Sequence, residues 1–314
     1  MKHFRWTMIF LLTGSYLLSA EPQKIIFDCD LAGDIDDAYA LALILSSPEL
    51  EVLGLVMDHG YTAKRAQVAC RLLYETGRED IPVVVGRQTD THYNHQFHWA
   101  EGFEKITPVK ESAAEFIIRL LDKYPDEIVL LTVGPVPNML DVLEKEPGIL
   151  KKAKQVVSMF GSFYMGYDGG PVPDREWNVR ADVQASRAFV QSGADLTFAG
   201  LDITTFVTLS QENRDRLLMR QSPLTDALSG LYTLWRFESY ARPDPTLFDV
   251  VAVGMVLWPD LFTTREAHVR VTDEGLTVID ETKPANCRIG IRIDQKVFID
   301  RIMERYLKQN LHRK

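Results

Sequence analysis

The chain of 314 residues has little cysteine, no excess of positive charge and no linker-like composition. Its three cysteines, Cys29, Cys70 and Cys287, form no CxxC pair, so we interpret them as small buried apolar residues rather than as a disulfide or zinc site. The net charge is −9 and no stripe of lysine and arginine occurs, which argues against a nucleic-acid-binding surface and favours a neutral or cationic substrate. No internal repeat and no stretch rich in glycine, serine or proline divides the chain.

The first 20 residues have the pattern of a cleaved secretory signal. Basic residues precede an apolar stretch over residues 8–18, and the small residues Ser19 and Ala20 follow it. The stretch is shorter than the roughly 20 residues of a membrane span, which argues against the alternative of an uncleaved anchor. We therefore predict a signal peptide over residues 1–20, export to the periplasm or the extracellular space, and a single domain over residues 21–314 that has no membrane contact after cleavage.

Short apolar runs alternate with segments of helical periodicity from residue 24 to about residue 205. This alternation predicts βαβ units, and so an α/β fold with a mainly parallel central sheet and helices on both faces. Farther on, the pattern predicts C-terminal helices and a small hairpin over residues 267–280. Two long segments without regular pattern, residues 87–110 and 161–176, are predicted to be binding loops.

Five aspartates occupy ten positions where the first predicted strand ends and the first predicted helix begins: Asp28, Asp30, Asp34, Asp36 and Asp37. Helix capping accounts for one or two carboxylates, so the others favour a bound cation. Calcium takes 6 to 8 oxygen ligands and accepts carboxylates, main-chain carbonyls and water. Histidine and cysteine are not grouped as zinc requires. The sequence therefore predicts Ca²⁺, with Mg²⁺ as the less favoured ion.

The stretch "IIFDCDLAGDIDDAYALAL" resembles the amino-terminal DxDxGxDDA motif of the nucleoside hydrolases of the inosine–uridine preferring type. Further segments match this family in the same order along residues 24–262: "LTVGPVPNML", "MFGSFY", "REWNVRADVQAS", "GADLTFAGLDIT" and "LFDVVAVGMVLWPDLF". The resemblance implies Ca²⁺-dependent hydrolysis of the N-glycosidic bond in ribonucleosides or related N-ribosides. It also implies that the chain can form a homo-oligomer.

The resemblance also implies roles for individual residues. Asp30 corresponds to the aspartate that binds the metal and takes a proton from the water held there. The other metal ligands implied are Asp37, Asp249 and the main-chain carbonyl of Val133. The residues implied to hold the sugar hydroxyls are Asp36, Glu176 and Asn178, and Asp28 is implied to support its neighbours. Independently of the resemblance, a metal-activated water with a neighbouring carboxylate as general base suits hydrolysis through a cationic sugar.

The sequence departs from the family pattern in its first loop and on the substrate side. Five residues, "LAGDI", separate Asp30 from Asp36 where the motif has three, and the added Asp34 is expected to bind solvent, cap the helix or add a ligand. Phe248 stands where many members have histidine near the leaving base. Tyr61 falls at a sugar-binding asparagine position, with Asp58 and His59 beside it as substitutes or ordinary loop residues.

Four further residues complete the predicted substrate side. Asp168 is the polar residue nearest to the position of a second sugar-binding asparagine. His98 lies in a loop that resembles the substrate-side loop of the family, and Tyr240 and Arg242 lie shortly before Asp249. Trp235 is expected in the core, with contact to a leaving group as the alternative.

Two other functions remain open from the sequence. One is a non-catalytic calcium- or sugar-binding homologue, which Phe248 and Tyr61 keep under consideration. The other is a phosphatase of the haloacid dehalogenase type, in which Asp28 would attack phosphate and Asp30 would act as acid. This second alternative explains neither Asp36 and Asp37 nor the "REWN" and "LFD" segments.

Overall fold

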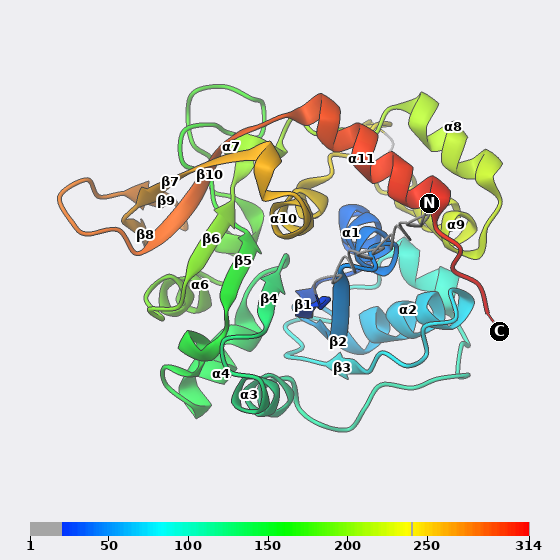
Figure 1. Cartoon of the computed structure of the whole chain (residues 1–314), viewed down its shortest axis with the longest axis horizontal. Coiled ribbons are helices and arrows are strands. Elements are labelled where there is room, and N and C mark those ends of the chain that lie inside the picture. The colour runs from blue at the N-terminus through cyan, green and yellow to red at the C-terminus, as the bar shows by residue number, and fades with distance from the viewer. Residues whose placement is uncertain (1–20, 240, 314) are drawn as a thin grey trace, which may run out of the picture.

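The computed structural model describes residues 21–239 and 241–313. The predicted signal peptide and Tyr240 therefore lie outside the described residues. An eight-stranded sheet runs through the protein in the order β3-β2-β1-β4-β5-β6-β10-β7, and every neighbouring pair is parallel except β10 and β7 (Figure 1). The strands are β1 (Gln23–Cys29), β2 (Leu50–Met57), β3 (Val83–Val85), β4 (Val129–Thr132), β5 (Gln155–Met159), β6 (Leu196–Ala199), β7 (Phe262–Ala267) and β10 (Cys287–Ile293).

Helices cover both faces of the sheet, as predicted for the α/β class (Figure 1). The helices are α1 (Asp36–Leu45), α2 (Thr62–Glu75), α3 (Ala113–Lys123), α4 (Pro137–Lys145), α5 (Trp177–Ala181), α6 (Val183–Val190), α7 (Leu201–Thr204), α8 (Gln211–Arg220), α9 (Pro223–Trp235), α10 (Phe248–Leu257) and α11 (Gln295–Lys308). Short 3₁₀ helices span His95–Ala100, Ile149–Lys152 and Pro259–Leu261.

Strand β1 shows why the core lies on both sides of the sheet. Its side chains alternate, so Ile25 and Phe27 pack into the core under α1, α2 and α10, whereas Ile26 packs into the core under α3, α4 and α6. A strand buried on both faces carries a continuous apolar run instead of an alternating one, as "IIF" over residues 25–27 does. Helix α1 is buried along its whole length, because it lies between the sheet and the helices α9, α10 and α11.

The C-terminal part follows the sequence prediction closely. The hairpin forms from β8 (Val269–Val271) and β9 (Thr277–Ile279), and Gly275 takes the positive φ of +81° in its turn.

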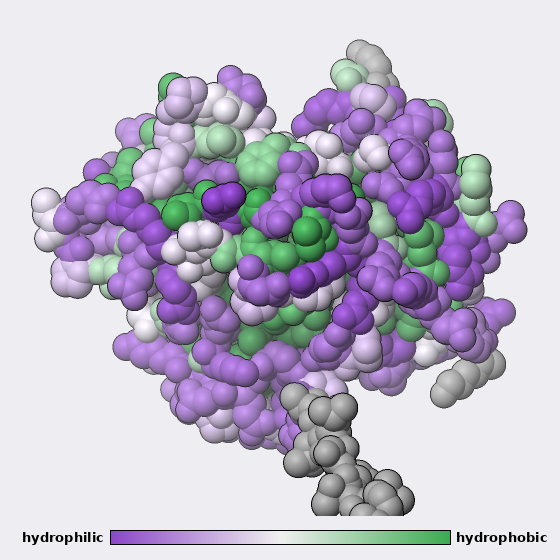
Figure 2. All heavy atoms as spheres, turned by 45° about the horizontal axis from the view of Figure 1, so that its top comes forward, coloured by the Kyte–Doolittle hydropathy of each residue, from purple (hydrophilic) through white to green (hydrophobic). Residues whose placement is uncertain are grey.

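Within the described part of the chain, no helix is long and apolar enough to cross a membrane. Figure 2 shows mainly hydrophilic residues on the face that it presents, with smaller hydrophobic areas between them.

The strand order determines where polar groups meet. Because β1 pairs with β2 on one side and with β4 on the other, the carboxyl ends of these three strands lie together. The Asp58 amide donates to the carbonyl of Cys29 at 2.9 Å, and the Val133 amide donates to the carbonyl of Asp28 at 2.9 Å. The chain leaves this edge toward β2 after β1 and toward β5, on the opposite side, after β4. The carboxyl edge between two such diverging connections is where α/β sheets bind ligands.

Candidate active site

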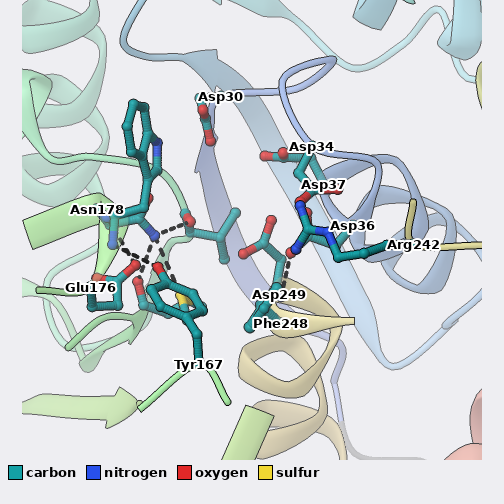
Figure 3. Close-up of a pocket in the computed structure, with 13 residues that line it drawn as sticks. Asp30, Asp34, Asp36, Asp37, Tyr167, Glu176, Asn178, Arg242, Phe248 and Asp249 are labelled. Carbon is teal, nitrogen blue, oxygen red and sulfur yellow. Dashed lines mark hydrogen bonds between the residues drawn. The ribbon is translucent and has the colours of Figure 1, made fainter. Parts of the chain in front are cut away.

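Three buried carboxylates meet beside the carboxyl end of β1. Asp36 and Asp37 lie in the first turn of α1, and Asp249 lies in the first turn of α10. One carboxylate oxygen from each lies within 4.8 Å of the others, and we call these three residues the carboxylate triad. The Asp249 amide donates to Oδ2 of Asp36 at 3.2 Å, which joins the two helix starts (Figure 3). Two helix N-termini therefore point at one acidic centre, and their dipoles favour its negative charge.

The carboxylate triad carries more negative charge than its neighbours neutralise. Burial raises the pKa of Asp36, Asp37 and Asp249 well above the usual range, and the negative charges of neighbouring aspartates raise it further. Oδ1 of Asp37 is buried and has no hydrogen-bond partner among the described residues. A buried carboxylate oxygen without a partner costs free energy, so this oxygen is placed to bind a ligand that the protein itself does not provide.

A hard divalent cation fits this arrangement. The triad and Val133, whose carbonyl accepts from the Asn178 amide group, line one cavity with a volume of about 330 Å³, and neither histidine nor cysteine lines it among the described residues. Such an all-oxygen donor set suits Ca²⁺ or Mg²⁺ and not Zn²⁺. Of the ligands implied by the sequence, the structure thus groups Asp37 and Asp249 with the Val133 carbonyl, and it adds Asp36, which the resemblance assigned to the sugar.

Glu176 and Asn178 form the opposite wall of this main cavity (Figure 3). The Glu176 carboxylate caps α5, since it accepts hydrogen bonds from the amides of Asn178 at 2.8 Å, Gly161 at 3.1 Å and Val179 at 3.2 Å. Burial raises its pKa, and these three bonds oppose the rise. The Asn178 amide group donates to the carbonyls of Val133 at 2.7 Å and Met159 at 3.0 Å. Asn178 thus fixes the Val133 carbonyl and leaves its own Oδ1 to accept from a ligand.

Asp30 and Asp34 lie at the border of the main cavity and a second cavity of about 480 Å³. Asp30 is not part of the carboxylate triad; its Oδ2 lies 3.4 Å from Nη2 of Arg65. Asp34 accepts from the amide of Ile35 at 2.7 Å and lines both cavities, and it does not cap α1, whose start has no side-chain cap. Burial raises the pKa of Asp34, and the charge of Arg242 opposes that rise.

Asp28 and Asp58 lie behind the site and line neither cavity. Asp28 is fully buried and accepts from Nδ2 of Asn138 at 2.8 Å. Burial raises the pKa of Asp28 to about 6 and that of Asp58 well above its usual range. Both oxygens of Asp58 are buried and have no hydrogen-bond partner among the described residues, and the neighbouring Asp28 carboxylate raises the pKa of Asp58 further. Asp58 is therefore a buried member of the acidic centre and not an ordinary loop residue.

Two predicted substrate residues, His98 and Asp168, do not line either cavity, so their contact with substrate stays a prediction. His98 lies in the 3₁₀ helix His95–Ala100, and its Nδ1 lies 3.2 Å from Oε2 of Glu101 in an exposed pair. Asp168 is exposed and accepts from the amide of Gly170 at 2.7 Å, which stabilises a turn. Arg242 does line the main cavity, where its guanidinium points toward Asp34 and Asp36 (Figure 3).

Aromatic and basic side chains also line the two cavities, and of these Tyr167, Trp177 and Arg65 were not recognised from the sequence. Tyr167 and Phe248 meet edge to face with ring centroids 6.0 Å apart in the main cavity. Trp177 borders both cavities with 46% of its surface exposed, and Trp235 lines the second cavity although it is nearly buried. Tyr61, His59, His92 and Arg65 also line the second cavity. The signal available for Trp177 was its position inside the "REWN" segment.

The fold and the site define an α/β enzyme whose acidic cavity opens beside the carboxyl ends of β1 and β4. The chain belongs to the inosine-uridine preferring nucleoside hydrolase family, which matches residues 25–300. It is therefore a nucleosidase, an N-glycosyl hydrolase, and the family relationship predicted from the sequence is confirmed. Enzymes of this family depend on a metal ion and act on small-molecule nucleosides.

Curated relatives and solved structures agree with this assignment. The chain is 28% identical over 308 residues to the pyrimidine-specific ribonucleoside hydrolase RihA of Citrobacter koseri, covering 90% of this chain and 97% of that one. It is 29% identical over 273 residues to the probable uridine nucleosidase 2 of Arabidopsis thaliana, covering 81% and 84%. The purine-preferring ribonucleoside hydrolase from Gardnerella vaginalis has the same fold, with a TM-score of 0.78, 23% identity, and coverage of 91% and 98%.

Proposed function

We propose that the protein is a Ca²⁺-dependent ribonucleoside hydrolase in which Asp30 is the general base. The observation that carries the proposal is the joint placement of Asp30, the carboxylate triad and the Val133 carbonyl around one cavity. Ca²⁺ is preferred to Mg²⁺ because several carboxylates and a carbonyl offer more oxygen ligands than Mg²⁺ usually takes from protein. Export through residues 1–20 and assembly into a homo-oligomer remain part of the proposal.

When bound, the cation would lower the pKa of water and hold sugar hydroxyls. The protein's own residues account for the remaining requirements. Asp30 accepts the proton of the water that attacks the anomeric carbon, and the N-glycosidic bond breaks as the base leaves. Glu176 and the free Oδ1 of Asn178 accept hydrogen bonds from the sugar and favour positive charge on it. Trp177 and Tyr167 line the main cavity and shield the reacting sugar from bulk water.

The side chains near the leaving base indicate which base leaves easily. No histidine lines the main cavity among the described residues, and Phe248 occupies the start of α10 beside Asp249. A purine leaves best when it is protonated, and neither Phe248 nor an arginine provides that proton at neutral pH. Arg242 can instead stabilise a base that leaves as an anion. We therefore propose pyrimidine nucleosides such as uridine as the preferred substrates, in agreement with the names of the relatives RihA and uridine nucleosidase 2.

Removal of calcium tests the metal requirement. The purified mature chain is expected to release free ribose from uridine in Ca²⁺, to lose this activity in excess chelator, and to regain it when Ca²⁺ is restored. Ribose is measured with a reducing-sugar assay against uridine, inosine and p-nitrophenyl riboside. Phosphate release from phosphoesters would instead support the dehalogenase-type alternative. Calcium binding without turnover of any riboside would support the non-catalytic homologue.

Phe248→His tests the proposed preference for the leaving base. An imidazolium at this position can donate a proton, so kcat/KM for inosine is expected to rise about tenfold or more, mainly below about pH 6.5 where histidine is protonated. The value for uridine should change much less. Phe248→Leu is the matched control, because it keeps an apolar side chain and adds no acid. An equal gain in both variants, or no gain in Phe248→His, would contradict the proposal.

A further inference from the structure

Arg65 is the only arginine or lysine that is buried in residues 21–239 and 241–313. It lies in the first turn of α2, and its side chain crosses to the carboxyl end of β1. Nε donates to the carbonyl of His59 at 2.8 Å, and Nη1 donates to the carbonyl of Leu31 at 2.9 Å and also to that of Asp30. Nη2 lies 3.4 Å from Oδ2 of Asp30. The guanidinium is thus fixed by three carbonyls and one carboxylate.

Two glycines leave the space that the guanidinium fills. A Cβ at Gly60 would lie 2.9 Å from Nη2 of Arg65, and a Cβ at Gly33 would lie 3.1 Å from Nη1. Gly60 also has a φ of +66°, so a side chain there would be strained as well as crowded. Gly33 belongs to the expanded "LAGDI" segment between Asp30 and Asp36. The added length of this loop therefore wraps around the Arg65 guanidinium.

The two oxygens of Asp30 face different surroundings. Oδ2 lies beside Arg65 and Gly33, where a Cβ would be 3.2 Å from it. Oδ1 lies on the other side, where a Cβ at Gly134 would be 2.9 Å from it and 2.6 Å from Oδ1 of Asp58. One oxygen of Asp30 thus lies beside a fixed positive charge, and the other lies at Gly134, on the side of the buried Asp58.

We propose that Arg65 is a positioning residue for hydrolysis: it holds Oδ2 of Asp30 and the main chain of the expanded loop, and so keeps the Asp30 carboxylate oriented to accept the proton of the attacking water. Arg65 touches neither sugar nor base in this role. The planar guanidinium has several N–H donors and can bind the carboxylate and the loop carbonyls at once, which a lysine ammonium cannot do. This inference rests on the proposed function, because it requires Asp30 to be the general base.

The test compares Arg65→Met and Arg65→Lys with the wild-type enzyme and with Arg220→Met. Arg220 is the matched control, since it also donates to two main-chain carbonyls, those of Leu307 and Gln309, but lies outside both cavities. Arg65→Met is expected to lower kcat for uridine about 10- to 100-fold, as loss of a group that orients a catalytic residue does elsewhere. We expect KM and the Ca²⁺ dissociation constant from calorimetry to change by about threefold or less, since transition-state stabilisation is lost rather than binding. Arg65→Lys should give an intermediate kcat.

The outcomes separate this inference from the proposed function. If wild-type protein releases no ribose in Ca²⁺, the proposed function fails. If wild-type protein is active and both Arg65 variants keep its kcat, only the role of Arg65 is wrong. A purely structural role would lower the free energy of unfolding in urea for Arg65→Met and Arg220→Met alike, and would leave kcat equal in the two. If Arg65→Met does not fold, Arg65→Lys decides: a lower kcat at unchanged KM supports the inference, and a wild-type kcat overturns it.

Discussion

Asp37→Asn is expected to abolish Ca²⁺-dependent hydrolysis and, at the same time, to stabilise the metal-free protein above about pH 5. Hydrolysis should fall by about 10³-fold, because the variant loses a carboxylate that holds charge at the reacting centre. The rise in melting temperature that Ca²⁺ gives the wild-type protein should also disappear, since a cation that binds only the folded state stabilises it. Activity assays and thermal unfolding with Ca²⁺ or chelator measure both effects.

The stabilisation follows from the raised pKa of Asp37. A carboxyl whose pKa is higher in the folded than in the unfolded protein favours folding below the unfolded value near 4, and this contribution is lost as the pH rises toward the folded pKa. Asparagine has no charge to bury, so the metal-free variant should lose less stability between pH 5 and pH 8. We expect a gain on the order of 1 kcal/mol in the free energy of unfolding measured in urea with chelator.

Asp226→Asn is the matched control, because Asp226 also lies in the first turn of a helix, α9, but is exposed and outside both cavities. It should leave activity and Ca²⁺ binding unchanged. The proposed metal site would be wrong if Asp37→Asn kept the thermal shift with Ca²⁺. It would also be wrong if the variant lost activity while its Ca²⁺ affinity stayed at the wild-type value.

Asp30→Asn is expected to lower kcat about 10²- to 10⁴-fold, which is the usual contribution of a general base. An asparagine amide keeps the shape of the side chain but cannot accept the proton of water. The carboxylate triad is left intact in this variant, so calorimetry should still show Ca²⁺ binding. Steady-state kinetics with uridine measure kcat and KM separately. A kcat within tenfold of wild type would show that Asp30 is not the base, whereas complete loss of Ca²⁺ binding would make it chiefly a metal ligand.

The sequence was sufficient for the fold class because each element carries a strong local pattern. The strand β1 contains the apolar run "IIF", and the helix α11 follows the final strand as predicted. The order of strands also follows a rule: parallel strands end at one edge, so residues after β1 and β4 had to come close together. The structure places Asp37, Asp249, Val133, Glu176 and Asn178 around one cavity, while their individual roles stay predictions.

Residues whose role depends on tertiary placement could not be found in this way. Arg65 lies in the first turn of an amphipathic helix, where sequence alone predicts a charged residue exposed to solvent. Asp58 follows β2 directly, and only the pairing of β1 with β2 brings it to Asp28. His98 and Asp168 show the opposite case, since a loop has no periodicity from which the direction of a side chain can be predicted.

Helix α1 has a consequence for how this enzyme can change over evolution. All ten of its residues are buried, so most substitutions there would disturb packing as well as Asp36 and Asp37. Arg242 and His92, by contrast, stand on loops at the rims of the two cavities, where replacements cost little stability. The protein can therefore acquire new leaving-group preferences through its rim loops while the groups that break the bond are inherited almost unaltered.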